Sequence, residues 1–191
     1  MDINDINTEK NFDSVRFEIE DLQNKTFEDC CFNSCIFEKT NLENTIFTDC
    51  IFTGCSLLLC RIDNTSFNNI EFNDCRLTGI NLTDCNDFLL NFSMNSCLLD
   101  NIFIADKKLQ NISFSRCDFK DSDLIRVNFK QADFSGCNFK KVLFEGCDLS
   151  NADFRSSKGY LIDPEQNRIR NAKFSLPEAQ SFLSFLNIKL D

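Results

Sequence analysis

Twelve cysteines and thirty acidic side chains are the residues of this chain that could bind a metal or take part in catalysis, and histidine is absent. Zinc sites usually combine converging Cys and His ligands, and Ser-His or Cys-His nucleophile pairs cannot form within the chain. A hydrolytic pair of carboxylates would also need a concave pocket. The composition therefore predicts that the protein is not an enzyme and has no metal site, no cofactor and no small-molecule substrate.

The spacing of the cysteines indicates packing rather than chemistry. All but Cys31 lie on one position of a five-residue pattern, where the other blocks mostly carry small or β-branched residues. These eleven cysteines are Cys30, Cys35, Cys50, Cys55, Cys60, Cys75, Cys85, Cys97, Cys117, Cys137 and Cys147. Because cysteine often behaves as a small buried hydrophobe, we predict that these thiols are buried and free and that Cys31 points outward. Metal binding or redox chemistry is the alternative interpretation.

The five-residue pattern is clearest in residues 117–156, which read CDFKD, SDLIR, VNFKQ, ADFSG, CNFKK, VLFEG, CDLSN and ADFRS. The third residue of every block is Phe or Leu, the first is small or β-branched, and the others are mostly polar. A period of five matches neither an amphipathic helix nor an alternating strand. Repetition at a short fixed period predicts a solenoid, in which each repeat buries its apolar side chains only against its neighbours.

These blocks resemble pentapeptide repeats, and the chain is similar to the pentapeptide-repeat protein family, including its quinolone-resistance (Qnr-like) branch. The resemblance implies an all-β solenoid, a right-handed quadrilateral parallel β-helix of about eight coils with one block on each side. It also implies a C-terminal capping and dimerisation α-helix. The best-known activity of the family, in the Qnr branch, is the binding of DNA gyrase and topoisomerase IV.

The pattern divides the chain into three parts. Residues 1–11 form a polar N-terminal lead-in, residues 12–176 form the repeat region, and residues 177–191 form a C-terminal helix and tail. A lead-in of this composition is expected to be poorly ordered. The repeat region itself is expected to be one continuous solenoid.

The register of the pattern breaks within residues 85–93, which read CNDFLLNFS. Moving the frame forward by two residues places Leu89, and then Met94, on the central apolar position. An insertion of this kind is either a bulge that offsets the β-helix or a recognition loop. The candidate partner-contact residues of this loop are Asn86, Asp87 and Phe88. Lys107, which stands at a small-residue position, indicates a second and milder disturbance.

The C-terminal segment predicts a helix, because Ser175 and Glu178 have the spacing of a capping box. The apolar face expected to cover the last coil consists of Leu176, Ala179, Leu183 and Leu186. Phe182 and Phe185 widen this apolar arc beyond what one end of the rod can cover, which is typical of an interface. The family resemblance implies a homodimer formed by this helix, with Phe182, Phe185, Leu186 and Ile188 as its interface residues.

The net charge of −10 is unevenly distributed. Residues 1–85 carry sixteen acidic and six basic side chains, whereas residues 86–191 carry fourteen of each. Direct binding of nucleic acid is disfavoured, because nucleic-acid-binding proteins are basic. The acidity either provides solubility or makes the rod a DNA mimic, and the Qnr resemblance implies that such a mimic binds a type II topoisomerase and protects it from quinolones. A structural scaffold for an unidentified protein partner is the alternative function.

The sequence also bears on location. No apolar run reaches the length needed to cross a membrane, and the acidic, polar N-terminus is unlike a secretory signal. We therefore expect a cytoplasmic protein that does not interact with membranes.

Overall fold

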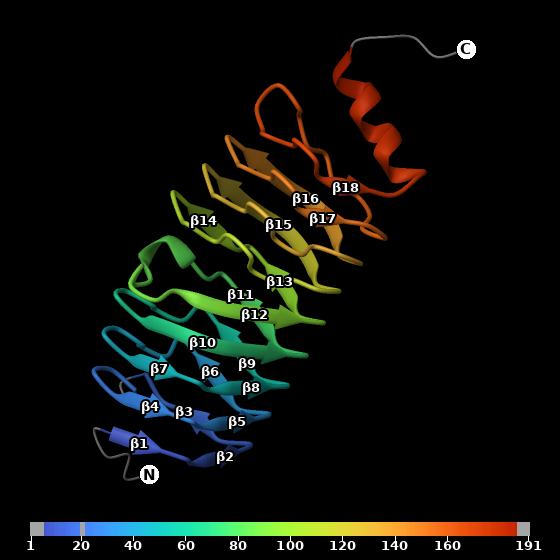
Figure 1. The fold of residues 1–191 in the computed structure, drawn as a ribbon. Helices are drawn as coiled ribbons and strands as arrows, with labels where there is room; N and C mark the ends of the chain where they lie inside the picture. The colour runs from blue at the N-terminus through green and yellow to red at the C-terminus, as the bar shows by residue number, and fades with distance from the viewer. Residues whose placement is uncertain (1–5, 20–21, 187–191) are drawn as a thin grey trace.

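A computed structural model of the chain describes residues 6–19 and 22–186. The chain folds as the predicted right-handed, four-sided parallel β-helix, with about eight turns stacked into a rod (Figure 1). The first described residues lie at one end of this rod and the last described residues at the other. Each turn is flanked by its neighbours along the axis, so the solenoid predicted from the five-residue pattern is confirmed.

One sheet of eight strands forms part of the wall of the rod, in the order β1-β4-β7-β10-β8-β5-β2, with β12 also paired to β10. Its strands are β1 (Ile6–Thr8), β2 (Asn11–Asp13), β4 (Thr26–Glu28), β5 (Cys31–Asn33), β7 (Ile46–Thr48), β8 (Ile51–Thr53), β10 (Ser66–Asn73) and β12 (Asn91–Asn95). Because β1 pairs in parallel with β4, the β-helix extends into the segment that the sequence suggested as a lead-in.

A second sheet of eight strands has the order β14-β15-β13-β11-β9-β6-β3, with β16 paired to β15, and β17 pairs with β18. Their bounds are β3 (Arg16–Phe17), β6 (Ile36–Glu38), β9 (Ser56–Leu58), β11 (Arg76–Thr78), β13 (Leu98–Asp100), β14 (Phe103–Ala105), β15 (Asp118–Ile125), β16 (Asn138–Glu145), β17 (Asp153–Phe154) and β18 (Lys173–Phe174). Two 3₁₀ helices complete the described elements, η1 (Leu82–Asp84) and η2 (Glu178–Leu186).

The corners of the rod explain which polar residues the repeat uses. A left-handed backbone conformation recurs at intervals of about five residues, as at Asn44 (φ 56°), Asp49 (φ 52°) and Gly54 (φ 63°). Gly, Asn and Asp adopt this conformation more readily than other residues. Side-chain amides at one corner also bond from coil to coil, since Asn64 Nδ2 donates to Asn44 Oδ1 at 2.8 Å. The polar positions of the repeat therefore form the turns between the four sides.

The interior consists of stacked aromatic rings. Phe32 pairs in register with Phe52 of the next coil, and their ring centroids lie 4.6 Å apart with an interplanar angle of 7°. Rings on adjacent sides meet edge to face, as between Phe47 and Phe52, at 5.4 Å and 71°. Both arrangements are favourable for aromatic pairs. Because these rings are almost fully buried, the aromatic stacks form the core of the described rod.

The interruption in the register changes the pairing between coils. Glu71 pairs with Ile51, twenty residues earlier, whereas Leu98 pairs with Arg76, twenty-two residues earlier. The prediction that Leu89 resumes the central position is wrong, because its side chain is 57% exposed and its φ is 56°. Met94 resumes the buried pattern instead. The two extra residues leave the wall as a loop before the register is restored.

The C-terminal cap differs from the predicted α-helix, because η2 is a 3₁₀ helix. Ser175 does not serve as the predicted cap of this helix, since its Oγ accepts a hydrogen bond from the Ser156 amide at 3.1 Å. Leu176 is 77% exposed and does not cover the last coil. Phe182 covers it, with its ring 4.8 Å from that of Phe174. Residues three apart align in a 3₁₀ helix, which places Phe182 and Phe185 on one face.

Replacing a ring in the middle of an aromatic stack should destabilise the rod strongly. We expect Phe32→Ala to lower the free energy of unfolding by about 3–5 kcal/mol, because a buried ring is replaced by a cavity. The matched control is Phe88→Ala, at a side chain that is 75% exposed, where the change should stay within about 0.5 kcal/mol. Urea unfolding followed by circular dichroism measures both. Equal shifts for the two variants would contradict the assigned core.

Candidate functional site

The thiols serve the packing of the rod. All twelve are free, eleven of them are buried and Cys31 is half-buried, so the packing interpretation is confirmed. Cys60 Sγ, for example, donates to the Phe37 carbonyl of the preceding coil at 3.1 Å. Burial raises the pKa of both Cys50 and Cys60 to about 12, which leaves little reactive thiolate at neutral pH. Within residues 6–19 and 22–186, no group of three or more Cys, Asp or Glu is arranged to hold a metal ion.

Carboxylates on the outside of the rod form ion pairs between coils. Arg126 binds Asp106 through two hydrogen bonds of 2.7 Å, and this contact lowers the pKa of the Asp106 carboxyl. Arg16 and Glu38 form a similar pair at 2.9 Å. Pairs exposed in this way contribute little stability. They place opposite charges on neighbouring coils rather than assembling an acid–base site.

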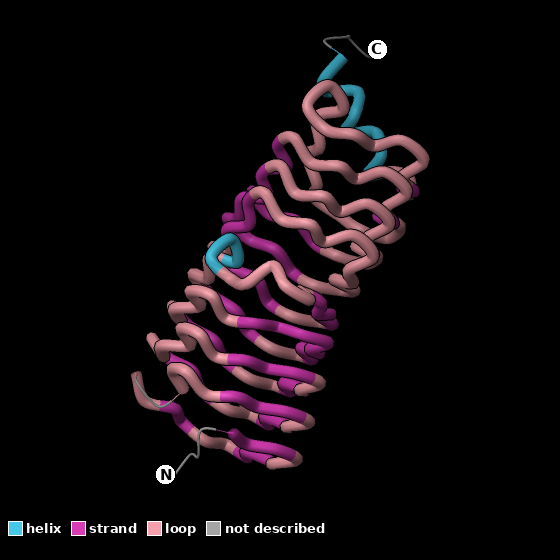
Figure 2. Tube along the Cα trace, turned by 60° about the vertical axis from the view of Figure 1, so that its left-hand side comes forward, coloured by secondary structure: helices cyan, strands magenta, loops and turns pink. Residues whose placement is uncertain are grey.

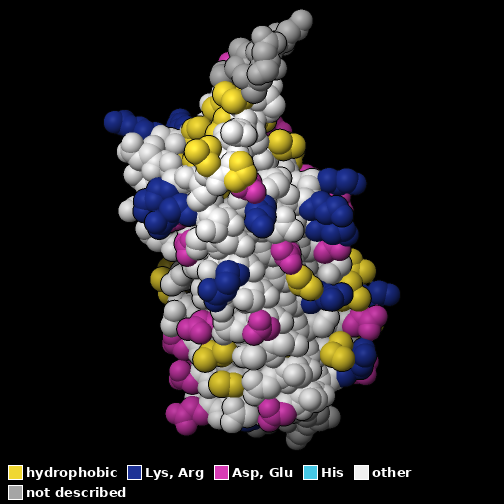
Figure 3. All heavy atoms as spheres, turned by 90° about the vertical axis from the view of Figure 1, so that its right-hand side faces the viewer, with side chains coloured by type: hydrophobic (Ala, Val, Ile, Leu, Met, Phe, Trp, Pro, Cys, Tyr) yellow, Lys and Arg dark blue, Asp and Glu magenta, His cyan; other side chains and the backbone are white. Residues whose placement is uncertain are grey.

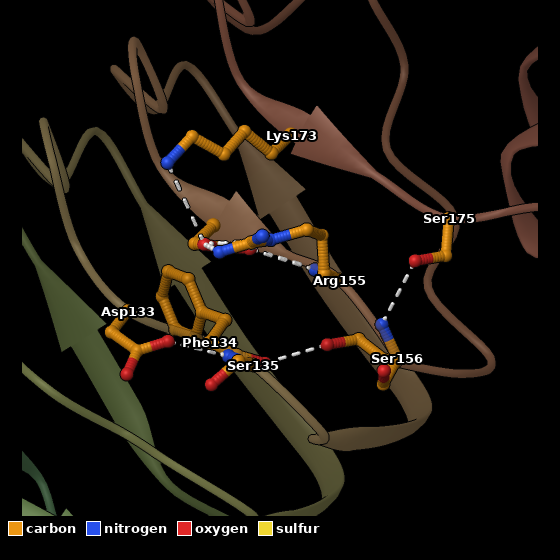
Figure 4. A network of polar contacts seen from close by, with 9 residues as sticks. Asp133, Phe134, Ser135, Arg155, Ser156, Lys173 and Ser175 are labelled. Atoms are coloured by element: carbon orange, nitrogen blue, oxygen red, sulfur yellow. Dashed lines mark hydrogen bonds and ion pairs between the residues drawn. The ribbon is translucent and has the colours of Figure 1, made fainter.

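One surface groove near the C-terminal end contains a cluster of charged residues. Arg155 and Lys173 both pair with the Asp153 carboxylate, at 2.6 and 3.8 Å, and Figure 4 shows the two cationic side chains converging on one carboxylate. Hydrogen bonding to Arg155 lowers the pKa of Asp153. Nearby, Asp133 accepts a hydrogen bond from the Ser135 amide at 2.8 Å. Both cations therefore pair with a carboxylate of the protein itself, while their side chains remain 61% and 59% exposed.

The interruption of the repeat forms an exposed loop, which we call the 86–90 loop. It follows η1, which lies on one side of the rod near its middle (Figure 2). Asn86 Nδ2 donates to Asn64 Oδ1 at 2.9 Å, and the Phe88 amide donates to Asn86 Oδ1 at 2.8 Å. The predicted contact residues Asn86, Asp87 and Phe88 thus lie together in one loop. Leu89 also belongs to its exposed surface, although the repeat pattern had placed it in the core.

Lys107 is part of the same feature. Its side chain is 5% exposed, and its Nζ donates to the Cys85 carbonyl at 2.7 Å and to Asp87 Oδ1 at 2.5 Å. The two irregularities predicted from sequence are therefore joined by an ion pair. This link was not predicted from the sequence. Its signal is nevertheless present there, since Lys107 and Cys85 are separated by the interval of twenty-two residues that the interruption creates.

Charge is graded along the rod. On the face that Figure 3 shows, acidic side chains gather toward the N-terminal end and basic side chains toward the C-terminal end. The exposed residues Glu9, Asp29 and Asp49 occupy the corner of three successive coils. The column then becomes neutral at Asn69, which donates to Asp49 Oδ1 at 2.6 Å. The acidic stripe is therefore confined to the N-terminal half.

The predicted dimer residues occupy different environments. Phe182 packs on the last coil, with its ring 6.1 Å from that of Tyr160. Phe185 lies beside Leu143 and Leu161 in a surface hollow, and these two leucines are 43% and 63% exposed. The side chain of Leu186 and the whole of Ile188 lie outside the described residues. Phe185, Leu143 and Leu161, which we call the end patch, are thus an apolar surface near the C-terminal end.

The fold is a β-helix built from a repeat of five residues. A family model described as "Pentapeptide repeat region" matches residues 25–104. A second, "Pentapeptide repeats (8 copies)", matches residues 108–140 and 133–158. Together they cover most of the chain, and the chain belongs to the pentapeptide-repeat family.

Solved structures of QnrB1, a plasmid-mediated fluoroquinolone resistance protein, are similar to this chain over its whole length. The full-length form matches with a TM-score of 0.65 and 15% identity, covering 96% of this chain and 100% of that one. Two trypsin-treated variants match with TM-scores of 0.64 and 0.65 and 16% identity, each covering 97% of this chain and 100% and 99% of theirs. At this identity the likeness shows the fold. The comparison with curated protein sequences gave no match.

The described helices also bear on membrane association. None of the helices within residues 6–19 and 22–186 is long and apolar enough to cross a membrane.

Thiol reactivity should separate Cys31 from the other cysteines. At pH 8, a disulfide-exchange reagent such as dithionitrobenzoate should titrate twelve thiols in denaturant, but only one promptly in the native protein, because burial blocks access to the rest. Cys31→Ser should abolish the prompt phase. Rapid reaction of several native thiols, or a denatured count well below twelve, would contradict the buried thiol layer.

Proposed function

We propose that this protein is a non-enzymatic, cytoplasmic partner of a type II topoisomerase, gyrase or topoisomerase IV, and that it protects the enzyme from quinolones as a DNA mimic. The observation that carries the proposal is the correspondence with the fluoroquinolone resistance protein QnrB1 along the whole length of both chains. Because one fold can host different functions, the proposal also needs support from the surface of this chain.

The acidic half of the rod provides that support. Its stripe of Glu9, Asp29 and Asp49 lies on one corner, with one carboxylate on each coil. A narrow rod with a line of negative charge complements the basic groove in which a topoisomerase holds DNA. The same acidity makes direct binding to nucleic acid unfavourable. The acidic half is therefore the part that we place against the enzyme.

We further propose that the protein is a homodimer joined at its C-terminal ends. In the end patch Leu143 and Leu161 are exposed and Phe185 is half-buried, and a twofold contact would pair this surface with itself. Leu186 and Ile188 are assigned to the same interface. Phe182 contributes through the cap that it forms on the last coil. Such a dimer would carry one acidic arm on each side.

A scaffold for a different protein partner is the second candidate. The observation that favours it is the 86–90 loop, where Phe88 and Leu89 form an exposed apolar surface away from the C-terminal end. Exposed apolar patches often mark protein interfaces. In this alternative the loop defines the partner and the acidic stripe provides solubility.

A supercoiling assay tests the topoisomerase proposal. Wild-type protein at micromolar concentration should restore gyrase supercoiling in the presence of a quinolone. The triple variant Glu9→Gln, Asp29→Asn, Asp49→Asn should need about tenfold more protein, because it loses the charges that match the enzyme. The matched control neutralises three exposed acids of the other half, through Asp118→Asn, Asp123→Asn and Glu145→Gln. No protection by wild type would favour the scaffold alternative, and equal effects of the two triple variants would refute the role of the stripe.

Sizing with light scattering tests the dimer. Wild type should have twice the monomer mass of 22.1 kDa, whereas Leu161→Glu combined with Phe185→Glu should give monomers, because four charges would face one another across a twofold contact. Ile46→Glu, at an exposed apolar side chain far along the rod, should remain dimeric. A monomeric wild type, or a dimeric double variant, would reject the assignment.

A further inference from the structure

On one side of one coil the central apolar residue is only partly buried. The buried central residues on this side are Phe67 in the coil before the 86–90 loop and Leu109 in the coil after it. Between them Asp87, Phe88 and Leu89 turn outward and are all exposed, and Leu90, next to the paired Asn91, packs partly buried against the core. An interior that is packed less completely is costly, so neighbouring side chains are needed here.

Two further side chains are buried beside Leu90. Phe92, at a position that is small in most coils, is 3% exposed and packs edge to face on Phe72 and Phe114, with ring centroids 6.4 and 6.1 Å away. The cavity that remains beside Phe67 and Phe92 measures only about 10 Å³. Lys107 then enters from the coil above, also at a small-residue position. The loop and these two residues are thus parts of one arrangement.

The Lys107 ammonium fixes the start of the loop. A buried ammonium is tolerated only where it is paired and hydrogen-bonded, and here the Cys85 carbonyl and the Asp87 carboxylate accept its protons at 2.7 and 2.5 Å. Asp87 itself is 75% exposed, so the ion pair reaches from the interior of the rod to its surface. The cation thereby ties the loop to the following coil.

Asn86 holds the loop from the opposite side. Its amide group donates to Asn64 in the coil below and its oxygen accepts from the Phe88 amide. Leu89, with a φ of 56°, adopts the left-handed conformation that recurs at the corners of the rod, as at Leu59 with a φ of 52°. The exposed tip, formed by Phe88 and Leu89, therefore has its direction imposed by contacts to the coils on both sides.

We propose that Lys107 is a positioning residue, which holds Phe88 and Leu89 as a preformed apolar tip for insertion into an apolar pocket of the partner. This inference rests on the proposed function and deepens it. The partner surface that fits has an apolar pocket next to cations, because the tip lies where the acidic half of the rod ends. Ordering the tip before binding reduces the entropy lost on association, and for that reason a residue that never touches the partner affects its affinity.

The test separates positioning from stability. Asp87→Ala leaves the ammonium buried without its anion and should destabilise the protein, whereas Lys107→Met combined with Asp87→Ala removes both charges and should regain stability. The loop of this double variant should be cleaved faster by chymotrypsin at Phe88 and Leu89. Its affinity for immobilised gyrase should fall by about tenfold. Asp87→Glu keeps the carboxylate and should retain most of the affinity.

The direct contribution of the tip is measured with Phe88→Ser combined with Leu89→Ser, which should weaken gyrase binding at unchanged thermal stability. A charge-free double variant that is stable, resists chymotrypsin and binds like wild type would overturn the positioning role. If wild type does not bind gyrase, the proposed function fails. The cleavage rates then decide the structural part of the inference, because a loop cleaved equally slowly with and without Lys107 and Asp87 would overturn it.

Discussion

Ring-on-ring stacking between successive coils is the interaction on which the whole molecule depends. Phe134 illustrates it, because its ring lies 5.4 Å from Phe114 below and 4.8 Å from Phe154 above, nearly parallel to both. A turn of this β-helix has no core without its neighbours. The buried thiols bond to carbonyl groups of the coil below and fill the layer beside the rings. Because these contacts pack the interior, the side chains at the outward positions can differ in charge and polarity without disturbing the core.

The sequence was informative wherever the repeat is regular. The period of five specifies which residues point inward, so the β-helix and the buried Phe and Cys layers could be predicted, and so could the separation of Cys31 from the buried thiols. The same rule failed at Leu89, because counting in fives cannot show that the chain leaves the wall. It also failed for η2, where an assumed period of 3.6 selected Leu176, while the 3₁₀ period aligns Phe182 with Phe185. The link between Lys107 and Asp87 was not predicted, although the interval of twenty-two residues between Cys85 and Lys107 that indicates it is present in the sequence.

The candidate site therefore lies where the repeat is interrupted. A regular rod presents four similar faces, which offer a partner few distinctive shapes to recognise. The 86–90 loop changes this, because its exposed apolar tip projects from the wall while Leu90 and Phe92 pack against the core beside it. The acidic corner and the end patch add charge and a second apolar surface at other heights along the rod. Each feature is carried by a few residues on a scaffold that the stacked rings hold rigid.

Photo-crosslinking from the loop tip tests this account most directly. Replacing Phe88 with the photoreactive residue p-benzoylphenylalanine, and Leu98 in the second sheet with the same residue as a control on another side of the rod, leaves the aromatic core intact because both positions are exposed. A crosslink to gyrase is expected from position 88 and should be absent or much weaker from position 98. Crosslinking from position 98 alone, or from neither position while gyrase is bound, would contradict this account.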